Sequence, residues 1–158
     1  MSLSPEALER FVCELAASPE RWRRFAEPSR DARVYQRIWD DQQVNAWVIC
    51  WDHGHDTGFH DHDQSSAAIL VVNGRVREER LRIAGAPASR TIGPGAPCFV
   101  PASAIHRVQH AGQRPAVTLH AYSPPLRRTG AYTVGAGGEL TRTAQAPEQE
   151  LRGEPALS

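Results

Sequence analysis

Hydrophobic residues near the start of the chain recur with helical spacing. A start signal precedes them at Ser4-Pro5-Glu6, where a capping hydroxyl is followed by a first-turn proline and an acid. The same signal at Ser18-Pro19-Glu20 predicts a second short helix through about Phe25. Residues 1–28 are therefore predicted to form a helical segment that packs on the rest of the chain. The apolar positions of the first helix, at i, i+3, i+4 and i+7, are Leu8, Phe11, Val12 and Leu15.

After Pro28 the pattern changes to short runs rich in Val, Ile, Trp and Tyr, separated by Gly, Pro or Asp. Many short strands with regular turns are typical of an all-β barrel or sandwich, predicted here over residues 29–143. Asn73-Gly74 lies between two runs and favours a hairpin turn. From about Ala144 the apolar period is lost, which predicts a loose tail over residues 144–158. The runs predict strands at 33–39, 44–51, 58–63, 67–72, 75–83, 98–100, 106–110, 116–122 and 132–134.

The length of 158 residues is enough for one domain with a substantial core. Basic and acidic residues number 18 each, so the chain lacks the basic surplus that nucleic acid or an anionic membrane requires of a main partner. Every basic residue is Arg, which excludes Schiff-base chemistry on lysine. The longest purely apolar run, Ala67 to Val72, is far too short to span a bilayer, and we find no signal peptide.

The three cysteines are odd in number and have no C-x-x-C spacing. This usage argues against a disulfide framework and favours a reducing compartment, so we expect a cytoplasmic protein. Cys50 shares a strand face with Val44, Ala46 and Val48, which predicts a core position. The sequence does not fix the oligomeric state, and a monomer or a weak homodimer remains open.

His60 and His62 stand two residues apart, so on a strand both imidazoles leave the same face. A third histidine from another strand, His106, can close a three-nitrogen face around one metal ion. A lone buried histidine is more often a hydrogen-bonded core residue, and the H-x-H pair raises the case for metal only moderately. Neutral imidazoles suit Fe, Zn, Cu or Ni, and three of them leave the open positions that catalysis needs.

Two motifs resemble those of the cupin superfamily. The first runs from Gly54 through His60 and His62 to Gly74, and the second from Gly95 through Pro101 to His106. The resemblance implies a single-domain cupin, a double-stranded β-helix or jelly-roll barrel.

The usual cupin metal glutamate would fall at Ala67, and the next acid downstream is Glu78, beyond the predicted turn. Three neutral imidazoles would leave the ion its full charge, which favours an anionic ligand such as a thiolate.

Three stretches resemble the cysteine dioxygenase type I family, together with Tyr35-x-Arg37 upstream. They are His60–Ser65, His106–Val108 and Pro115–Pro125. The resemblance implies Fe(II) held by His60, His62 and His106. It also implies that L-cysteine binds the iron through sulfur and amine and is oxidised by O₂ to cysteine sulfinic acid.

The same resemblance implies roles for other residues. Arg37 would clamp the substrate carboxylate, which a planar guanidinium can bind bidentately, and Tyr35 would line the pocket. Thr118, His120 and Tyr122 alternate along one predicted strand and would form a hydrogen-bonded chain that positions the tyrosine hydroxyl beside the iron. Without the resemblance, Arg37 fits an exposed strand position, and the others fit ordinary core positions.

Animal members of the family carry a cysteine at the position that matches Ala67, cross-linked to the tyrosine that matches Tyr122. Alanine has no sulfur, so we predict no such cross-link in this chain.

Three alternatives remain. One is dioxygenation of 3-mercaptopropionate, although relatives with that preference tend to carry glutamine where Arg37 stands. Another is a non-catalytic cupin that binds a metal or a small ligand, and the third is a Zn or Ni cupin with isomerase or hydrolase chemistry. The presence of Arg37 and Tyr122 favours a thiol dioxygenase.

Overall fold

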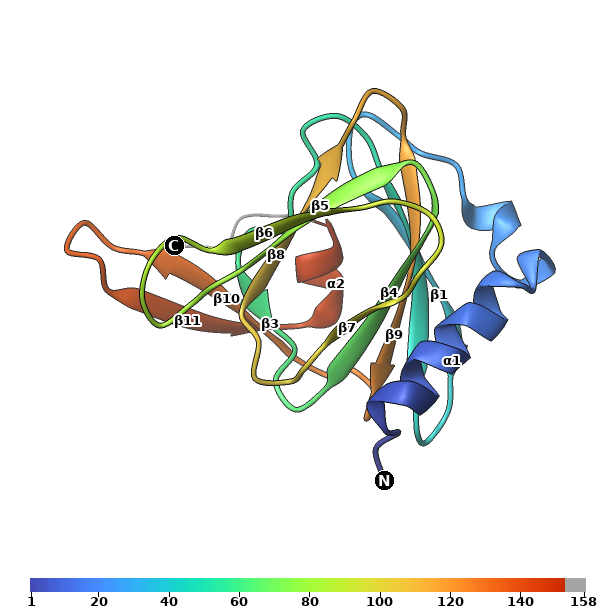
Figure 1. Cartoon of the computed structure of the whole chain (residues 1–158), viewed down its shortest axis with the longest axis horizontal. Coiled ribbons are helices and arrows are strands. Elements are labelled where there is room, and N and C mark those ends of the chain that lie inside the picture. Colours follow the sequence, from blue (N-terminus) through green and yellow to red (C-terminus); the bar gives the residue numbers. More distant parts are fainter. Residues whose placement is uncertain (153–158) are drawn as a thin grey trace.

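The computed structural model describes residues 1–152 and consists mainly of two antiparallel β-sheets that face each other around a common interior (Figure 1). One sheet has five strands in the order β1-β2-β9-β4-β7, and the other has six in the order β11-β10-β3-β8-β5-β6. The strands are β1 (Val34–Asp40), β2 (Asn45–Trp51), β3 (His60–Asp61), β4 (Ser66–Asn73), β5 (Arg75–Arg80), β6 (Ala88–Ile92), β7 (Cys98–Val100), β8 (His106–Ala111), β9 (Ala116–Ser123), β10 (Thr129–Val134) and β11 (Leu140–Gln145). The prediction of an all-β barrel with a short helical segment before it is confirmed.

The five-stranded sheet is buried on both faces. Side chains of its inner face, such as Trp47, Ile49 and Ile69, meet those of the other sheet inside the barrel. The outer face is covered by helix α1 (Pro5–Ala16), which packs on β4 and β9 (Figure 1). This double burial explains why β2 reads as a nearly continuous apolar run rather than an alternating one. Cys50 lies in the outer core, and the prediction of a core position is confirmed.

The N-terminal helix has the predicted start. The hydroxyl of Ser4 accepts a hydrogen bond from the Ala7 amide at 3.2 Å, and Pro5 occupies the first turn. Leu8, Val12 and Leu15 are buried against the sheet. The second predicted helix is instead two short 3₁₀ turns, η1 (Pro19–Arg21) and η2 (Arg23–Phe25).

The hairpin predicted at Asn73-Gly74 is wrong. β4 pairs with β7 and β9, whereas β5 pairs with β6 and β8, so the turn carries the chain from one sheet to the other. Gly74 has a φ of +71°, but Asn73 is not among the residues with positive φ, so the turn lacks the backbone of a type I′ hairpin. The turn also passes close to β9, because a Cβ added to Gly74 would lie 2.5 Å from the Pro115 carbonyl oxygen.

Three elements were not predicted: β6, β11 and α2 (Pro147–Arg152). The expectation of a loose tail from residue 144 is wrong as far as Arg152. Leu151 is 1% exposed and belongs to the core inside the barrel, and Figure 1 shows α2 between the two sheets. β11 is mostly exposed and is fixed by pairing with β10, so its sequence carries little apolar signal. Residues 153–158 lie outside the described residues.

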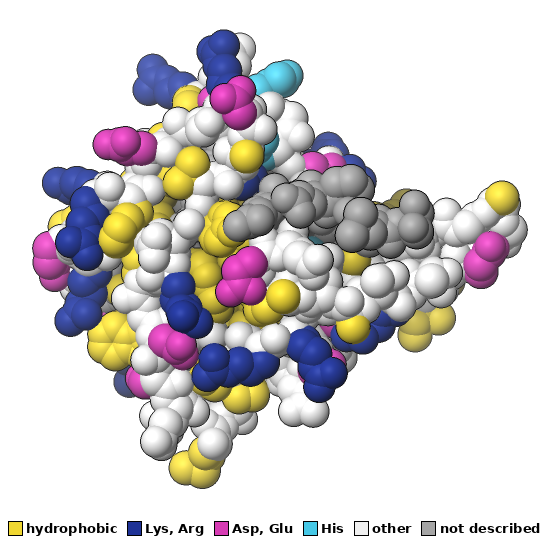
Figure 2. Space-filling model, turned by 180° about the vertical axis from the view of Figure 1, so that it is seen from behind, with side chains coloured by type: hydrophobic (Ala, Val, Ile, Leu, Met, Phe, Trp, Pro, Cys, Tyr) yellow, Lys and Arg dark blue, Asp and Glu magenta, His cyan; other side chains and the backbone are white. Residues whose placement is uncertain are grey.

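The described surface mixes charges of both signs. Figure 2 shows Arg side chains interspersed with Asp and Glu side chains on one face of the molecule. Within residues 1–152, no helix has the length and apolar character that a membrane crossing needs.

Replacing Gly74 with alanine should destabilise the protein, because the added Cβ meets the Pro115 carbonyl and the backbone has positive φ. We expect a loss of about 1–3 kcal/mol in the free energy of unfolding, measured by denaturant titration. Gly93→Ala is the matched control, since its Cβ would meet nothing within 4 Å and its φ is not positive. Equal stability of the two variants would contradict the close approach at Gly74.

Candidate metal centre

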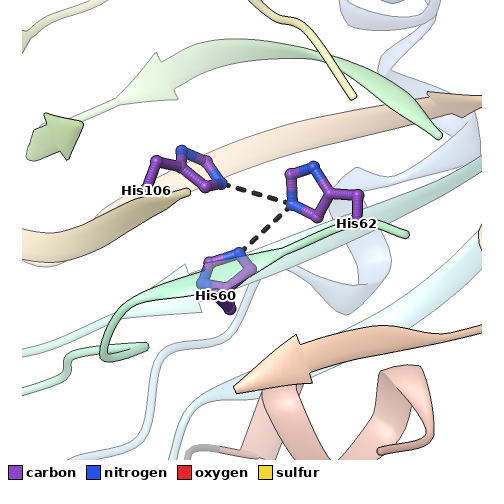
Figure 3. A group of neighbouring side chains, drawn as sticks. All are labelled: His60, His62 and His106. Atoms are coloured by element: carbon purple, nitrogen blue, oxygen red, sulfur yellow. Dashed lines mark hydrogen bonds between the residues drawn. The ribbon is translucent and has the colours of Figure 1, made fainter. Parts of the chain in front are cut away.

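Three buried histidines converge inside the barrel. His60 on β3 lies directly opposite His106 on β8, and His62 follows β3 immediately. The Nε2 atom of His62 is 3.2 Å from the Nε2 atoms of both His60 and His106 (Figure 3). All three residues are at most 2% exposed. The structure thus brings together the three residues that the sequence predicted as ligands, although β3 is shorter than the predicted strand.

The ring protonation fits a bound cation. The Nδ1 atoms of His60 and His106 lie 3.1 Å from the Gly58 carbonyl oxygen and from a Glu78 carboxylate oxygen, respectively. Both partners are acceptors, so each Nδ1 carries the proton and each Nε2 turns a lone pair toward His62. A neutral His62 has one ring proton and can donate to at most one of these lone pairs. A metal ion would accept a lone pair from each ring, and ligand nitrogens at about 2.0–2.1 Å from an ion stand about 3 Å apart.

Strand β3 is held in place by Asp61, whose side chain points away from the two histidines. Its carboxylate accepts hydrogen bonds from the Tyr132 hydroxyl at 2.6 Å and from Arg142 at 2.7 and 2.9 Å. Burial alone would raise the pKa of Asp61, but the hydrogen bonds from Arg142 and Tyr132 lower it to about 2. These contacts tie β3 to β10 and β11 and so fix where the flanking imidazoles stand.

The carboxylate nearest the histidines belongs to Glu78, a position that no spacing in the sequence links to the site. Burial would raise its pKa, but hydrogen bonds from His106, Arg80 and Arg90 lower it to about 2. The predicted set of direct ligands remains three imidazoles, and one of them is backed by this negative charge.

Burial keeps His62, His106 and His120 neutral. It lowers the pKa of His62 well below its usual value, that of His106 to about 4 and that of His120 to about 3. Repulsion between the crowded rings acts in the same direction. Neutral imidazoles are the form that binds metal, so the site is prepared for an ion at neutral pH.

Thr118, His120 and Tyr122 form the predicted chain along β9. His120 Nε2 lies 2.9 Å from the Thr118 hydroxyl, and His120 Nδ1 lies 3.2 Å from the Tyr122 hydroxyl. The sequence did not predict the start of this chain, where Trp51 on β2 donates its indole N–H to Thr118 at 2.8 Å. Since the indole is only a donor, the Thr118 hydroxyl can donate a hydrogen bond to His120 Nε2. His120 then donates from Nδ1 to the Tyr122 oxygen, which leaves the Tyr122 O–H to act as a donor.

Strand register places Tyr122 beside the histidines. The ring of Tyr122 packs edge-on against that of His62, with centroids 5.0 Å apart, and against Trp47 at 5.5 Å. Ala67 lies directly opposite Tyr122 across β4 and β9 and is fully buried. The position that matches the family's cross-linking cysteine is therefore adjacent to the tyrosine but has only a methyl group.

Arg37 is on the inner side of the sheet, and the structure pairs its guanidinium with Asp40. It pairs with Trp47 of β2, which in turn pairs with the inward-facing His120, and a β-bulge follows Arg37 directly. Its side chain is 48% exposed and its guanidinium lies 3.1 Å from the Asp40 carboxylate. Tyr35 is partly buried and packs on the interior core.

A cavity of about 350 Å³ opens beside His62. Its walls include Gln42, Ser65, Arg127 and Arg128. Arg127 lies 3.7 Å from Asp40, so that acid stands between Arg37 and a guanidinium of the cavity wall. The cavity is large enough for a small amino acid, and seven of its nine lining residues have polar or charged side chains.

The chain has a cupin-type fold, and its converging imidazoles form a site that could hold a metal ion. Solved structures with the same fold include TT1209 from Thermus thermophilus, with a TM-score of 0.57 at 19% identity over 65% of this chain and 93% of that one. BH2720 from Bacillus halodurans gives a TM-score of 0.55 at 20% identity over 78% of this chain and 87% of that one. A protein from Klebsiella pneumoniae described as having a double-stranded β-helix domain gives 0.57 at 13% identity over 65% of this chain and 80% of that one. At these identities the likeness establishes the fold alone.

The family model described as cysteine dioxygenase type I matches residues 6–134, and the chain belongs to this family. Cysteine dioxygenase type 1 of Danio rerio is 27% identical over 139 residues, which cover 80% of this chain and 68% of that protein. The Rattus norvegicus protein of the same description is 28% identical over 122 residues, 70% of this chain and 60% of that protein. The match thus leaves about a third or more of each relative's length uncovered.

The buried neutral histidines predict acid sensitivity of the metal-free protein. An unfolded chain takes up protons on His106 near pH 6.5, whereas the folded chain does so only near pH 4. The unfolded state therefore binds more protons across this range, and stability should fall as the pH drops from about 6.5 to 4. The check is the melting temperature of chelator-treated protein against pH.

His106→Asn should make this pH dependence shallower, and His53→Asn, at an exposed histidine outside the site, should leave it unchanged. A melting temperature of the wild-type protein that stays constant from pH 6.5 to 4 would contradict the burial of neutral rings.

Proposed function

We propose that this protein is an Fe(II)-dependent thiol dioxygenase that oxidises L-cysteine with O₂ to cysteine sulfinic acid. The observation that carries the proposal is the close approach of the three Nε2 atoms next to the hydrogen-bonded chain that ends at Tyr122. Family membership supports the same reaction. The described cysteines, Cys13, Cys50 and Cys98, are all free, which supports a reducing cytoplasmic location.

The reaction joins both oxygen atoms of O₂ to the substrate sulfur. The sulfur loses the electrons that O₂ gains, so no further reductant is required. Fe(II) held by His60, His62 and His106 would supply the electron chemistry that lets O₂ react with a thiolate. The neutral imidazoles place no negative charge directly on the ion, so its open positions would favour a substrate that binds as an anion.

Tyr122 would act at the reacting end of the substrate. With His120 donating to its oxygen, the Tyr122 hydroxyl can donate its own proton to a substrate carboxylate or an oxygen atom. The chain from Trp51 through Thr118 fixes the orientation of His120 and hence of this hydroxyl. Burial keeps the pKa of His120 at about 3, so the ring positions Tyr122 without adding charge.

Arg37 would bind the substrate carboxylate after releasing Asp40. The pair is partly exposed, so its separation costs little in water, and the β-bulge lets the side chain turn toward the interior. In this proposal Asp40 holds Arg37 until a substrate carboxylate replaces it. Dioxygenation of 3-mercaptopropionate is the second candidate, because that thiol also carries a carboxylate that Arg37 could bind.

Purified protein loaded with ferrous iron should consume O₂ when cysteine is added, and mass spectrometry should find cysteine sulfinate carrying both atoms of labelled O₂. His60→Ala should remove most bound iron and the activity, because one of three ligands is lost. Specificity constants for cysteine and 3-mercaptopropionate decide between the two substrates. Absence of O₂ uptake by an iron-loaded sample with either thiol would contradict the proposal and favour a non-catalytic cupin that binds a metal or a small ligand.

Arg37→Gln should lower kcat/KM for cysteine by roughly 10–100-fold, because one charged hydrogen-bonding partner of the carboxylate is worth about 1.5–3 kcal/mol. Cysteamine is the matched control, since it has the thiol and the amine but no carboxylate. Its turnover or competitive binding should change little. Cysteine turnover that survives within twofold, or an equal loss for both thiols, would contradict the clamp.

A further inference from the structure

Glu78 stands where the fold brings three strands together. On β5 it lies opposite Arg90 of β6 and Val108 of β8, and Arg80 on the same strand lies opposite His106. Its side chain is 1% exposed. Because pairing on both sides of β5 sets these neighbours, the position of Glu78 is as fixed as that of the histidine it contacts.

Both carboxylate oxygens of Glu78 have partners. One accepts hydrogen bonds from His106 Nδ1 at 3.1 Å and from Arg80 Nε at 2.8 Å, and the other accepts from Arg90 Nε at 2.7 Å. The Cys98 thiol lies 3.8 Å from the second oxygen, and burial raises its pKa to about 11, so it is neutral. Glu78 therefore provides the negative charge of this cluster.

At His106 the positive charge of Arg80 offsets part of that negative charge, but the effect of Glu78 is larger. The side chains of Arg80 and Arg90 are 27% and 50% exposed, so water screens them, whereas Glu78 is enclosed and contacts the histidine directly. They hold the carboxylate ionised and in one orientation.

The three histidines are not equivalent in their outer contacts. His60 donates from Nδ1 to a neutral carbonyl, and among the described residues His62 Nδ1 has no hydrogen-bond partner. His106 Nδ1, in contrast, is backed by a carboxylate. An imidazole that donates to a carboxylate is a more basic ligand and is fixed as the tautomer with its Nε2 lone pair toward the ion.

We propose that Glu78 is a positioning residue of the metal centre. The usual cupin glutamate ligand is replaced by Ala67, and Glu78 supplies a negative charge to the centre instead, through its hydrogen bond to His106. This proposal shares one assumption with the proposed function, namely that the three histidines bind a metal ion. It can therefore be tested with ions that do not support oxidation.

The test measures binding of Co²⁺ and Fe²⁺ to the full chain by competition with a chromophoric chelator. Glu78→Gln should weaken both ions about 10–100-fold, the usual effect of losing such a partner. Glu79→Gln is the matched control, because this neighbour pairs with Arg77 and Arg107, away from the histidines. The affinity of the Glu79→Gln variant for both ions should stay within twofold of the wild-type value. Wild-type affinity in folded Glu78→Gln would overturn the proposal.

The reduction potential of the bound iron distinguishes an effect of the Glu78 charge from a purely structural role of this residue. Removing a negative charge disfavours Fe(III), so the Fe(III)/Fe(II) potential of Glu78→Gln should move to more positive values. An unchanged potential would overturn the charge role.

Glu78→Asp keeps the charge and should weaken binding less than Glu78→Gln. If the glutamine variant does not fold, the aspartate variant decides alone: a loss of threefold or more supports the proposal, and wild-type affinity overturns it. Because Co²⁺ binding needs neither cysteine nor O₂, these outcomes are independent of whether the protein oxidises thiols.

Discussion

Three imidazole nitrogens crowded into the barrel interior are the constraint on which the site depends. Two Nε2 lone pairs face His62 at 3.2 Å, and the rings are buried too deeply for water to screen them. Protonation is opposed by burial and by the neighbouring rings. A divalent ion that accepted a lone pair from each ring would relieve this repulsion, so the arrangement is suited to holding a metal.

Both sheets of the barrel contribute residues to the surroundings of the three histidines. The six-stranded sheet supplies the ligands and their outer contacts, with Asp61 tying β3 to β10 and β11 and Glu78 backing His106. The five-stranded sheet supplies the chain from Trp51 to Tyr122, whose end packs against His62. The candidate metal ligands and the residues proposed to act on the substrate thus lie on opposite walls of one interior.

The charged side chains near the candidate site differ in their exposure to water. The carboxylate nearest the ligands, Glu78, is enclosed, whereas the guanidinium proposed to bind substrate, Arg37, remains half in water and is held by Asp40. A buried charge acts strongly and permanently on its neighbour, while an exposed pair can exchange partners at little cost. The first suits a permanent metal centre and the second suits a substrate that enters and leaves.

The sequence by itself determined the strands with strong apolar runs, the capped first helix and the three histidines, because period, cap and spacing are local. It failed where the deciding partner was distant. Asn73-Gly74 has the local chemistry of a hairpin, but sheet pairing makes it a crossing between sheets. β11 and α2 have little local signal and are fixed by β10 and by the barrel interior. Trp51, Glu78 and Asp40 became partners of site residues only through strand register and side-chain packing, since a contact across a sheet leaves no trace in the spacing of one strand.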